Sequence, residues 1–328
     1  MSMSELCAEY LDKAQNGKLI TRRGNAKKQS TIYTDKGRIA RHIIPLLGRR
    51  TVKDITVTDV NKFLADVIGG KTAADVKTKS RGRAIVKGGR GTGSRTLGLL
   101  GGIFTYAVSQ GYRPDNPCAG IVRPAYRRRK YRLDEEGYRK LGECLQEAAA
   151  RGEPWSSIAA IKALALTGAR RGEMEGLRRI EVDARSGALR LVDSKTGESI
   201  RPTGRRAFDV LLDALSRTNS DFVFPSPVEP AKPYRGLPKA FKRIVSAKLP
   251  DLTPHKLRHA FASAAEDVGL SVPTIGALLG HADSGVTQGY IHKVDPVLVE
   301  AANRVADYIA RSMSAKASNV IPLKERRA

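Results

Sequence analysis

Apolar residues recur at helical spacing through most of this chain, and glycine or proline interrupts the pattern repeatedly. The spacing predicts helices over 3–15, 31–47, 95–110, 156–167 and 254–268, with others that begin near Thr56, Asp134, Pro273 and Pro296. Two short stretches, 189–192 and 199–201, have the composition of strands joined by a tight turn. The sequence therefore predicts a mainly α fold with one small antiparallel β-sheet.

The chain of 328 residues is long enough for two domains, each with its own core. The first is expected over 1–124 and is helical, with a glycine-rich basic insert at 69–94 that should form a loop or a hairpin. A basic linker over 125–132 leads to a second, mostly helical domain at 133–313. The C-terminal tail, 314–328, is expected to be disordered.

The charge is strongly positive and unevenly distributed. The net charge is +25, and residues 1–132 hold 28 Lys and Arg against 9 Asp and Glu. This balance indicates a polyanionic partner bound through release of counterions from phosphates, although a solvated surface without a partner is the alternative. The expected phosphate contacts are Arg81, Arg83, Lys87 and Arg90 in the insert and Arg127, Arg128, Arg129 and Lys130 in the linker.

Several classes of protein are disfavoured. No apolar run approaches the ~20 residues that a transmembrane helix needs, and the N-terminus lacks a secretory signal. The three cysteines, Cys7, Cys118 and Cys144, are widely spaced, which fits reduced thiols and no metal knuckle. We expect a cytoplasmic, nucleoid-associated protein without a membrane partner, metal or cofactor.

Four of the five histidines lie between His255 and His292. His255, Arg258 and His259 occupy positions i, i+3 and i+4 of a predicted helix, so they should share one face. An arginine and a histidine stacked in this way can both reach one phosphate.

Other reactive residue types surround this group in the sequence. Arg170 follows a Thr-Gly pair at a predicted helix end, and Glu173 lies one turn on, where it could orient the guanidinium. Lys195 stands at the predicted hairpin turn and could deliver a proton. His281 follows Gly280 at the end of a short helix, with Tyr290 close behind it.

These motifs resemble those of the tyrosine recombinase (phage integrase) family. That family has, in order, a Thr-Gly-x-Arg-x-x-Glu box, a hairpin lysine, a His-x-x-Arg box, a Leu-Gly-His box and a tyrosine nine residues later. Here they stand at 167–173, Lys195, 255–258, 279–281 and Tyr290. The strand after the lysine departs from the family, since it reads Ile-Arg-Pro-Thr-Gly where the family commonly has an arginine followed by a Val-Pro-Leu-like strand. The resemblance covers 133–313 and, more loosely, 3–124.

The resemblance implies an enzyme that cleaves and rejoins DNA at specific sites through a 3′-phosphotyrosyl intermediate, without metal or ATP. A tyrosine of pKa ~10 needs a base or a cationic site to react at neutral pH. The implied roles are nucleophile for Tyr290, phosphate binding for Arg170 and Arg258, general acid for Lys195, and proton transfer for His255 and His281, with Glu173 and His259 in support.

The same resemblance implies a two-domain clamp on double-stranded DNA and a homo-oligomer, from dimer to tetramer, with an accessory DNA-bending protein as a further candidate partner. The last predicted helix could dock on a neighbouring protomer or pack on its own domain. The basic insert and the charge favour an integrase of a phage or other mobile element, and Xer-type dimer resolution is the alternative within the family.

Other functions explain the sequence less well. A zinc enzyme could use His255, His259 and His281, but Lys256 stands where a zinc peptidase has its glutamate, and Arg258 would repel the ion. A non-catalytic DNA-binding regulator explains the charge but not the set of Arg, His and Tyr. A type IB topoisomerase uses similar chemistry, yet the Leu-Gly-His box and the domain layout favour a recombinase.

Overall fold

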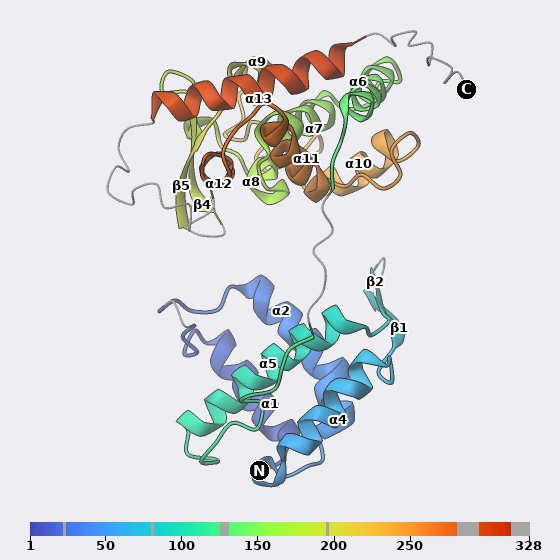
Figure 1. The fold of residues 1–328 in the computed structure, drawn as a ribbon, viewed down its shortest axis with the longest axis vertical. Coiled ribbons are helices and arrows are strands. Elements are labelled where there is room, and N and C mark those ends of the chain that lie inside the picture. Colours follow the sequence, from blue (N-terminus) through green and yellow to red (C-terminus); the bar gives the residue numbers. More distant parts are fainter. Residues whose placement is uncertain (22–23, 80–81, 125–130, 195–196, 281–294, 316–328) are drawn as a thin grey trace, which may run out of the picture. The chain divides into compact units, whose positions relative to one another are not determined.

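The computed structural model describes residues 1–21, 24–79, 82–124, 131–194, 197–280 and 295–315. The chain divides into two compact units, Met1–Arg128 and Arg129–Ala328, and each unit has a hydrophobic core of its own (Figure 1). Helices dominate both units and the strands form small antiparallel sheets, so the predicted fold class is confirmed. The expected ends of the domains at 124 and 133 stay predictions.

Helices build the core of unit 1. They are α1 (Met3–Gln15), α2 (Gln29–Arg38), the π-helical turn η1 (Ile39–Ile43), α3 (Ile44–Leu47), the 3-10 turn η2 (Val52–Asp54), α4 (Val57–Ile68) and α5 (Arg90–Ser109). The helix predicted over 31–47 therefore begins slightly earlier, at Gln29, and contains a π turn that ends two residues before Pro45. Proline has no amide hydrogen and clashes with the carbonyl four residues back, which accounts for a local widening at this point.

The insert of unit 1 forms a hairpin, one of the two forms that were expected. Strands β1 (Ala74–Lys79) and β2 (Gly82–Val86) pair antiparallel, with Val76 opposite Ala84. Helix α5 begins at Arg90, about one turn before the start predicted near Arg95, so Arg90 belongs to the helix and not to the insert. The first turn of α5 contains glycines, so it lacks the apolar pattern by which a helix is predicted. Gly93 is needed there because it packs so closely on Ile68 that a side chain would not fit.

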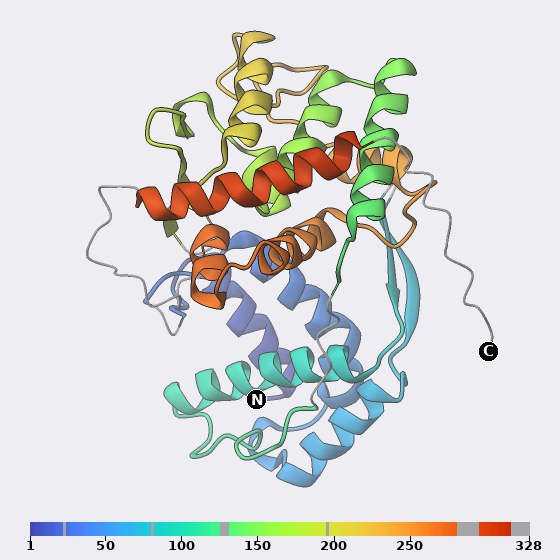
Figure 2. The same cartoon turned by 45° about the horizontal axis from the view of Figure 1, so that its top comes forward.

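In unit 2, a central helix, α7, is surrounded by other helices. Its helices are α6 (Glu135–Ala150), α7 (Trp155–Thr167), α8 (Arg171–Glu175), the 3-10 turn η3 (Arg179–Glu181), α9 (Arg205–Ser216), α10 (Leu237–Val245), α11 (Pro254–Asp267), α12 (Val272–Leu279) and α13 (Pro296–Ser314). Helix α7 is largely apolar, with Lys162 exposed on one side, and it contacts α6, α9, α10, α11 and α13. Figures 1 and 2 show α13 crossing one side of the unit, where it packs against α6, α7 and α9.

The sheet of unit 2 lies beside these helices. Strands β3 (Val182–Asp183), β4 (Ala188–Ser194) and β5 (Gly197–Pro202) pair antiparallel in that order, which confirms the predicted hairpin between the last two. Strand β5 also contacts α12, and this contact brings the end of the sheet to the candidate site. No helix in the described part of the chain is both long and apolar enough to cross a membrane.

Candidate active site

The site begins at the turn that ends α7. Gly168 adopts a left-handed conformation, with φ 59°, and its carbon packs against Phe261 of α11 and Leu279 of α12. Only glycine fits here without strain or collision. The hydroxyl of Thr167 accepts a hydrogen bond from the Ala169 amide at 3.2 Å and stabilises the turn. The Thr-Gly pair therefore directs the chain sharply from α7 toward Arg170.

Arg170 stands immediately before α8 and is bonded to Glu173. The Glu173 carboxylate accepts from the Arg170 backbone amide at 2.8 Å and from its guanidinium at 2.6 Å. The Arg170 side chain keeps 25% of its surface exposed, whereas that of Glu173 keeps 6%. The structure thus shows the local pairing that the sequence predicted, with one side of the guanidinium still accessible.

Arg258 of α11 is buried at the centre of the site, with 6% of its surface exposed. Its guanidinium donates to the carbonyl oxygen of Gly168 at 2.8 Å and to that of Leu279 at 2.7 Å. These two carbonyls terminate α7 and α12, where helices leave acceptors without intrahelical partners. A single side chain therefore connects three helices and places a positive charge at their junction.

A third arginine, Arg201, completes the cluster and was not among the predicted site residues. It lies in β5 with 4% of its surface exposed, and it donates to Glu173 at 2.9 Å and to the Leu279 carbonyl. The only signal in the sequence is that the Ile-Arg-Pro strand departs from the family pattern of an arginine followed by a Val-Pro-Leu-like strand. Arg170 and Arg201 thus share the Glu173 carboxylate, and Arg201 and Arg258 share the Leu279 carbonyl. We call the four residues Arg170, Glu173, Arg201 and Arg258 the arginine cluster.

The electrostatics of the arginine cluster are those of an anion site. Burial, followed by repulsion from Arg201 and Arg170, lowers the pKa of Arg258 to about 10. Burial also lowers the pKa of Arg201, against the opposing attraction of Glu173. Burial acts to raise the pKa of Glu173, but the charge of Arg201 and the bonds from Arg170 outweigh it and lower that pKa. Three cations against one anion leave an excess of positive charge that an incoming phosphate would neutralise.

The two histidines of α11 are more exposed than the arginine between them. His255 and His259 are exposed and their rings meet edge to face at 4.8 Å, whereas Arg258 points into the interior. Positions three and four residues apart lie on one side of a helix, whereas the adjacent residues Arg258 and His259 are about 100° apart around it. Arg258 therefore lies at the buried edge of this face and the two histidines at its exposed edge, and the shared face stays a prediction. Burial, followed by the charges of His255 and Arg258, lowers the pKa of His259.

Three predicted catalytic residues, Lys195, His281 and Tyr290, lie outside the described residues. The neighbouring ends of β4, β5 and α12 are described. Ser194 pairs with Gly197 across the turn that holds Lys195, and Gly280, in a left-handed conformation at φ 62°, ends α12 just before His281. These assignments stay predictions.

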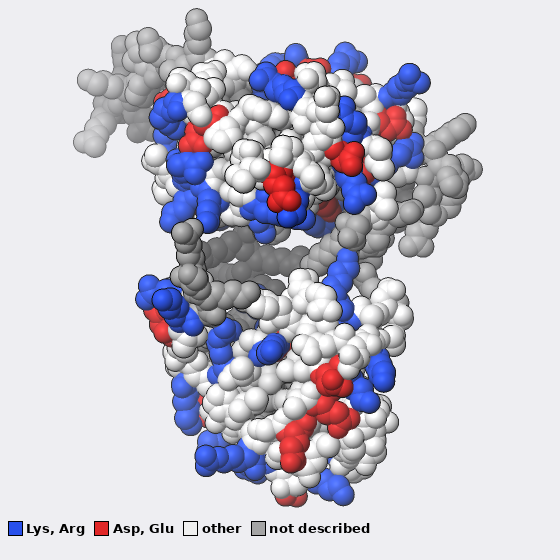
Figure 3. All heavy atoms as spheres, turned by 180° about the vertical axis from the view of Figure 1, so that it is seen from behind, with Lys and Arg blue, Asp and Glu red and all other residues white. Residues whose placement is uncertain are grey.

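The predicted DNA contacts are only partly described. Arg81, Arg127, Arg128, Arg129 and Lys130 lie outside the described residues. Arg83 forms a two-pronged ion pair with Asp75 across the hairpin, at 2.5 and 2.6 Å, which offsets its charge. Lys87 and Arg90 are exposed and pair with no carboxylate of the described residues. Figure 3 shows basic side chains around the margins of unit 1, with an acidic strip between them, and further basic patches on unit 2.

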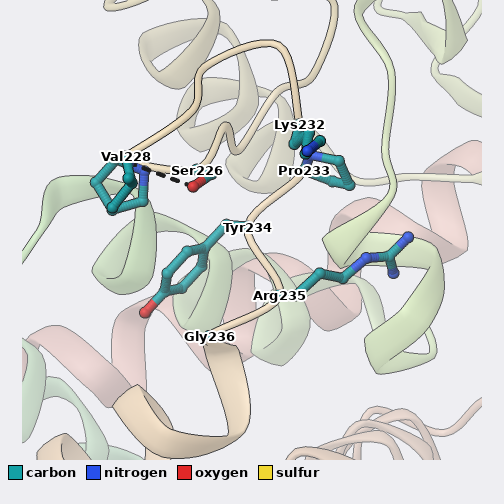
Figure 4. Close-up of a pocket in the computed structure, with 8 residues that line it drawn as sticks. Ser226, Val228, Lys232, Pro233, Tyr234, Arg235 and Gly236 are labelled. Carbon is teal, nitrogen blue, oxygen red and sulfur yellow. Dashed lines mark hydrogen bonds between the residues drawn. The ribbon is translucent and has the colours of Figure 1, made fainter.

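A separate hollow of about 470 Å³ lies in the loop before α10 (Figure 4). Lys232, Tyr234 and Arg235 line it, and the Ser226 hydroxyl accepts from the Val228 amide at 3.3 Å. No member of the arginine cluster lines this hollow. It is therefore not part of the candidate site.

Comparisons with known protein families match both units. Residues 132–296 match the phage integrase family, and residues 24–67 match the phage integrase N-terminal SAM-like domain. The chain is 31% identical to the tyrosine recombinase XerC of Erythrobacter litoralis over 223 residues, which span 66% of this chain and 71% of that protein. It is 28% identical to the tyrosine recombinase XerD of Vibrio vulnificus over 217 residues, or 61% and 68% of the two chains.

Solved structures with the same fold include DNA-bound integrases. A dimer of lambda integrase (residues 75–356) bound to a COC′ core site matches with a TM-score of 0.65 at 19% identity, over 90% of this chain and 100% of that one. The Tn1549 transposon integrase (residues 82–397) in complex with circular intermediate DNA matches with a TM-score of 0.64 at 15% identity, over 92% and 98%.

The family match covers half of the chain and includes the whole arginine cluster. The chain therefore belongs to the phage integrase family and is a tyrosine recombinase, an enzyme that cleaves and rejoins DNA.

Proposed function

We propose that the arginine cluster is the phosphate-binding part of a DNA cleavage site whose nucleophile is Tyr290. The single observation that carries this proposal is the surplus of cations: two guanidinium groups pair with one carboxylate, and a third, that of Arg258, is buried and bonded only to the carbonyls of Gly168 and Leu279 among the described residues. A scissile phosphate would bring the missing negative charge. The cluster also holds the end of α12, from which the chain continues to His281 and Tyr290.

The proposed reaction follows from the residue types. The Tyr290 oxygen attacks phosphorus, forms a 3′-phosphotyrosyl bond and displaces the 5′-oxygen, which leaves as a hydroxyl once Lys195 protonates it. Arg170 and Arg258 hold the non-bridging oxygens and stabilise the charge that develops on them. A second 5′-hydroxyl reverses the step, so rejoining needs no outside energy source.

His255 and His281 are assigned to proton transfer, His255 from the tyrosine and His281 to the phosphate. The exposed ring of His255 suits this role, because a substrate can reach it. His259, edge to face with His255 at 4.8 Å, would fix the orientation of that ring.

The proposed partner is double-stranded DNA, bound by unit 1 as the core-binding domain and by unit 2 as the catalytic domain. The lambda integrase structures in the comparison contain a dimer on a core site and a tetramer on a Holliday junction. We infer that this chain likewise acts as a dimer that forms a tetramer on DNA, with 314–328 as a tail beyond the catalytic domain. An accessory DNA-bending protein and a nucleoid-associated, cytoplasmic location would accompany this role.

Integration or excision of a phage or other mobile element is the favoured biological role. The basic hairpin of unit 1 and the strong positive charge support it, since they add DNA-binding surface to the helical domain. The similarity to XerC and XerD supports the alternative, resolution of chromosome or plasmid dimers. Plasmid assays would separate the two roles: one pairs two different sites on separate molecules, and the other pairs two copies of one site in a dimer.

The mechanism is tested by trapping the intermediate. Binding sites are first selected from random DNA, and each is then nicked just beyond a candidate scissile phosphate so that the cleaved end diffuses away. We expect a covalent protein–DNA complex on a denaturing gel with EDTA present, and none with Tyr290→Phe. A covalent complex formed by Tyr290→Phe would show that another residue is the nucleophile. A protein that binds its site without any covalent product would favour the non-catalytic regulator.

A further inference from the structure

Arg201 uses each of its three guanidinium nitrogens to bind the protein itself. Nε donates to the Ser199 hydroxyl at 2.9 Å, one terminal nitrogen donates to the Leu279 carbonyl, and the other donates to Glu173 at 2.9 Å. The side chain is almost fully buried. This differs from Arg170, whose guanidinium is partly exposed and, among the described residues, is bonded to Glu173 alone.

The partners of Arg201 are shared with both proposed phosphate-binding arginines. Glu173 Oε1 accepts from Arg201 and also from Arg170. The Leu279 carbonyl accepts from Arg201 and also from Arg258. Arg201 thus shares one hydrogen-bond acceptor with Arg170 and another with Arg258. It connects β5 to the start of α8 and to the end of α12.

The end of α12 is fitted around this side chain. Gly280 adopts a left-handed conformation at φ 62°, and a Cβ added to it would collide with the Arg201 guanidinium. The direction in which the chain leaves α12 therefore depends on where Arg201 lies. The next residue in the sequence is His281.

We infer that Arg201 is a positioning residue, which fixes the exit of α12 ahead of His281 and holds Glu173 against Arg170. This inference rests on the proposed function, because it assigns Arg201 to the same site. Arg201 itself does not contact the phosphate. It acts by restricting the geometry of residues that do, and misplacement by about 1 Å can slow an enzymatic step by about a hundredfold.

A purely structural role predicts different behaviour. Removing one partner of a buried ion pair usually destabilises a fold, although here Glu173 keeps its pair with Arg170 and the Leu279 carbonyl keeps its bond from Arg258. Arg201→Met should therefore lower the thermal midpoint of unit 2 but leave the protein folded at the assay temperature, and the cleavage step should slow by more than the loss of folded protein explains. A structural role predicts instead that stability, DNA binding and cleavage decline together.

The test measures single-turnover formation of the covalent complex by the full chain on the nicked site, at saturating protein and well below the melting temperature. We expect Arg201→Met to be slower by about ten- to a hundredfold with DNA affinity unchanged, and Arg201→Lys to recover part of the rate because it keeps the charge and one donor. Arg190→Met is the matched control, since Arg190 lies opposite Ile200 in the same sheet and pairs with Asp183 at 2.9 Å. It should react at the wild-type rate. A wild-type rate for Arg201→Met would overturn the inference.

A double-mutant cycle tests the contact with Gly280. Gly280→Ala adds backbone strain in any background, but it also collides with the guanidinium when Arg201 is present. We expect Gly280→Ala to slow the wild type more than it slows Arg201→Ala. Independent, additive effects would contradict the proposed coupling.

A second readout keeps this inference separate from the proposed reaction. Hydrogen exchange of the full chain should become faster at the end of α12 in Arg201→Met and stay unchanged in Arg190→Met. If the wild type forms no covalent complex, the proposed function fails, and the exchange result alone decides whether Arg201 holds this segment. If the covalent complex depends on Tyr290 and exchange is unaltered in Arg201→Met, the positioning role is wrong.

Discussion

Arg258 donates a hydrogen bond to the carbonyl oxygen of Gly168 at 2.8 Å. This bond joins two motifs that lie 90 residues apart in the sequence, and it places the guanidinium at the turn from which Arg170 emerges. The left-handed glycine aims its carbonyl inward, and the arginine satisfies it. The same bond therefore helps to build the turn and to position the charge.

The two hydrogen bonds of the Arg258 guanidinium should be essential for DNA cleavage. Arg258→Lys keeps a positive charge but cannot reach both carbonyl oxygens, so the remaining cation has no fixed direction. We expect formation of the covalent complex to slow by about a hundredfold, with DNA affinity little changed. Arg179→Lys is the matched control, because Arg179 also donates to two carbonyls, those of Leu215 and Thr218, but is exposed. Equal rates for Arg258→Lys and wild type would contradict the proposed role.

The sequence predicted the local parts of this site and missed the part that depends on distant contacts. Arg170 and Glu173 are three residues apart on one helical turn, so a spacing rule identifies their pairing. Arg201 meets Glu173 across 28 residues and Leu279 across 78, and no pattern in the sequence connects them. The burial of Arg258 was missed for a similar reason, because the helices that cover it are set by packing.

The fold shows the same division. Long helices with a clear apolar stripe, such as α1, α4 and α6, were predicted close to their observed bounds. Helix α8 has only five residues, too few to display a period. The first turn of α5 contains two glycines, so its helical pattern is absent from the sequence. Helix α9 was also missed, although Ala207, Phe208, Leu211 and Ala214 do stand at helical spacing.

Two neighbouring glutamates should affect stability in opposite directions as pH changes. The pKa of Glu173 is lowered, so its stabilising contribution is present above the ordinary value of 4.5 and is lost as pH falls through the folded value. The pKa of Glu175 is raised, chiefly by burial, so its contribution is present below 4.5 and is lost as pH rises through its folded value.

Urea denaturation followed by fluorescence tests these signs, because the single tryptophan, Trp155, reports on unit 2. Glu173→Gln should lower the free energy of unfolding at pH 7 by about 3 kcal/mol, since it breaks a buried ion pair, and should flatten the loss on acidification. Glu175→Gln should instead flatten the decline that accompanies rising pH. Parallel profiles for the two variants would contradict the assignment.

The exposed cations beside the hairpin should contribute to DNA affinity through salt-dependent contacts. Lys87→Ala and Arg90→Ala should each reduce the slope of log affinity against log salt by about 1, because each removes about one phosphate contact. Arg83→Ala should have a smaller effect, since Asp75 already pairs with it. Lys248, which bridges Glu143 and Glu147 in unit 2, supplies a control whose substitution should leave the slope unchanged. Unaltered slopes for Lys87→Ala and Arg90→Ala would remove the hairpin base from the DNA-binding surface.

The buried His42 of unit 1 should make that unit sensitive to mild acid. Its Nδ1 lies 2.5 Å from the Thr72 hydroxyl, at the turn that leads into the hairpin, and only 2% of its surface is exposed. Burial, followed by repulsion from Arg41 and Arg38, lowers its pKa below 6.5. The unfolded chain therefore takes up a proton before the folded chain does, and unit 1 is most stable above pH 6.5 and less stable as pH falls below it.

Circular dichroism during urea denaturation can follow unit 1, once the unit 2 transition has been located by Trp155 fluorescence. We expect the unit 1 transition to move to lower urea between pH 7.5 and pH 5.5 in the wild type. His42→Gln cannot take up the proton and should lose this shift, whereas His255→Gln, at an exposed position of unit 2, should retain it. A shift of equal size in His42→Gln would mean that another group of unit 1 is protonated in this range. Because His42 holds the turn before the hairpin, the same protonation should also loosen the base of the hairpin, next to Lys87 and to the start of α5 at Arg90.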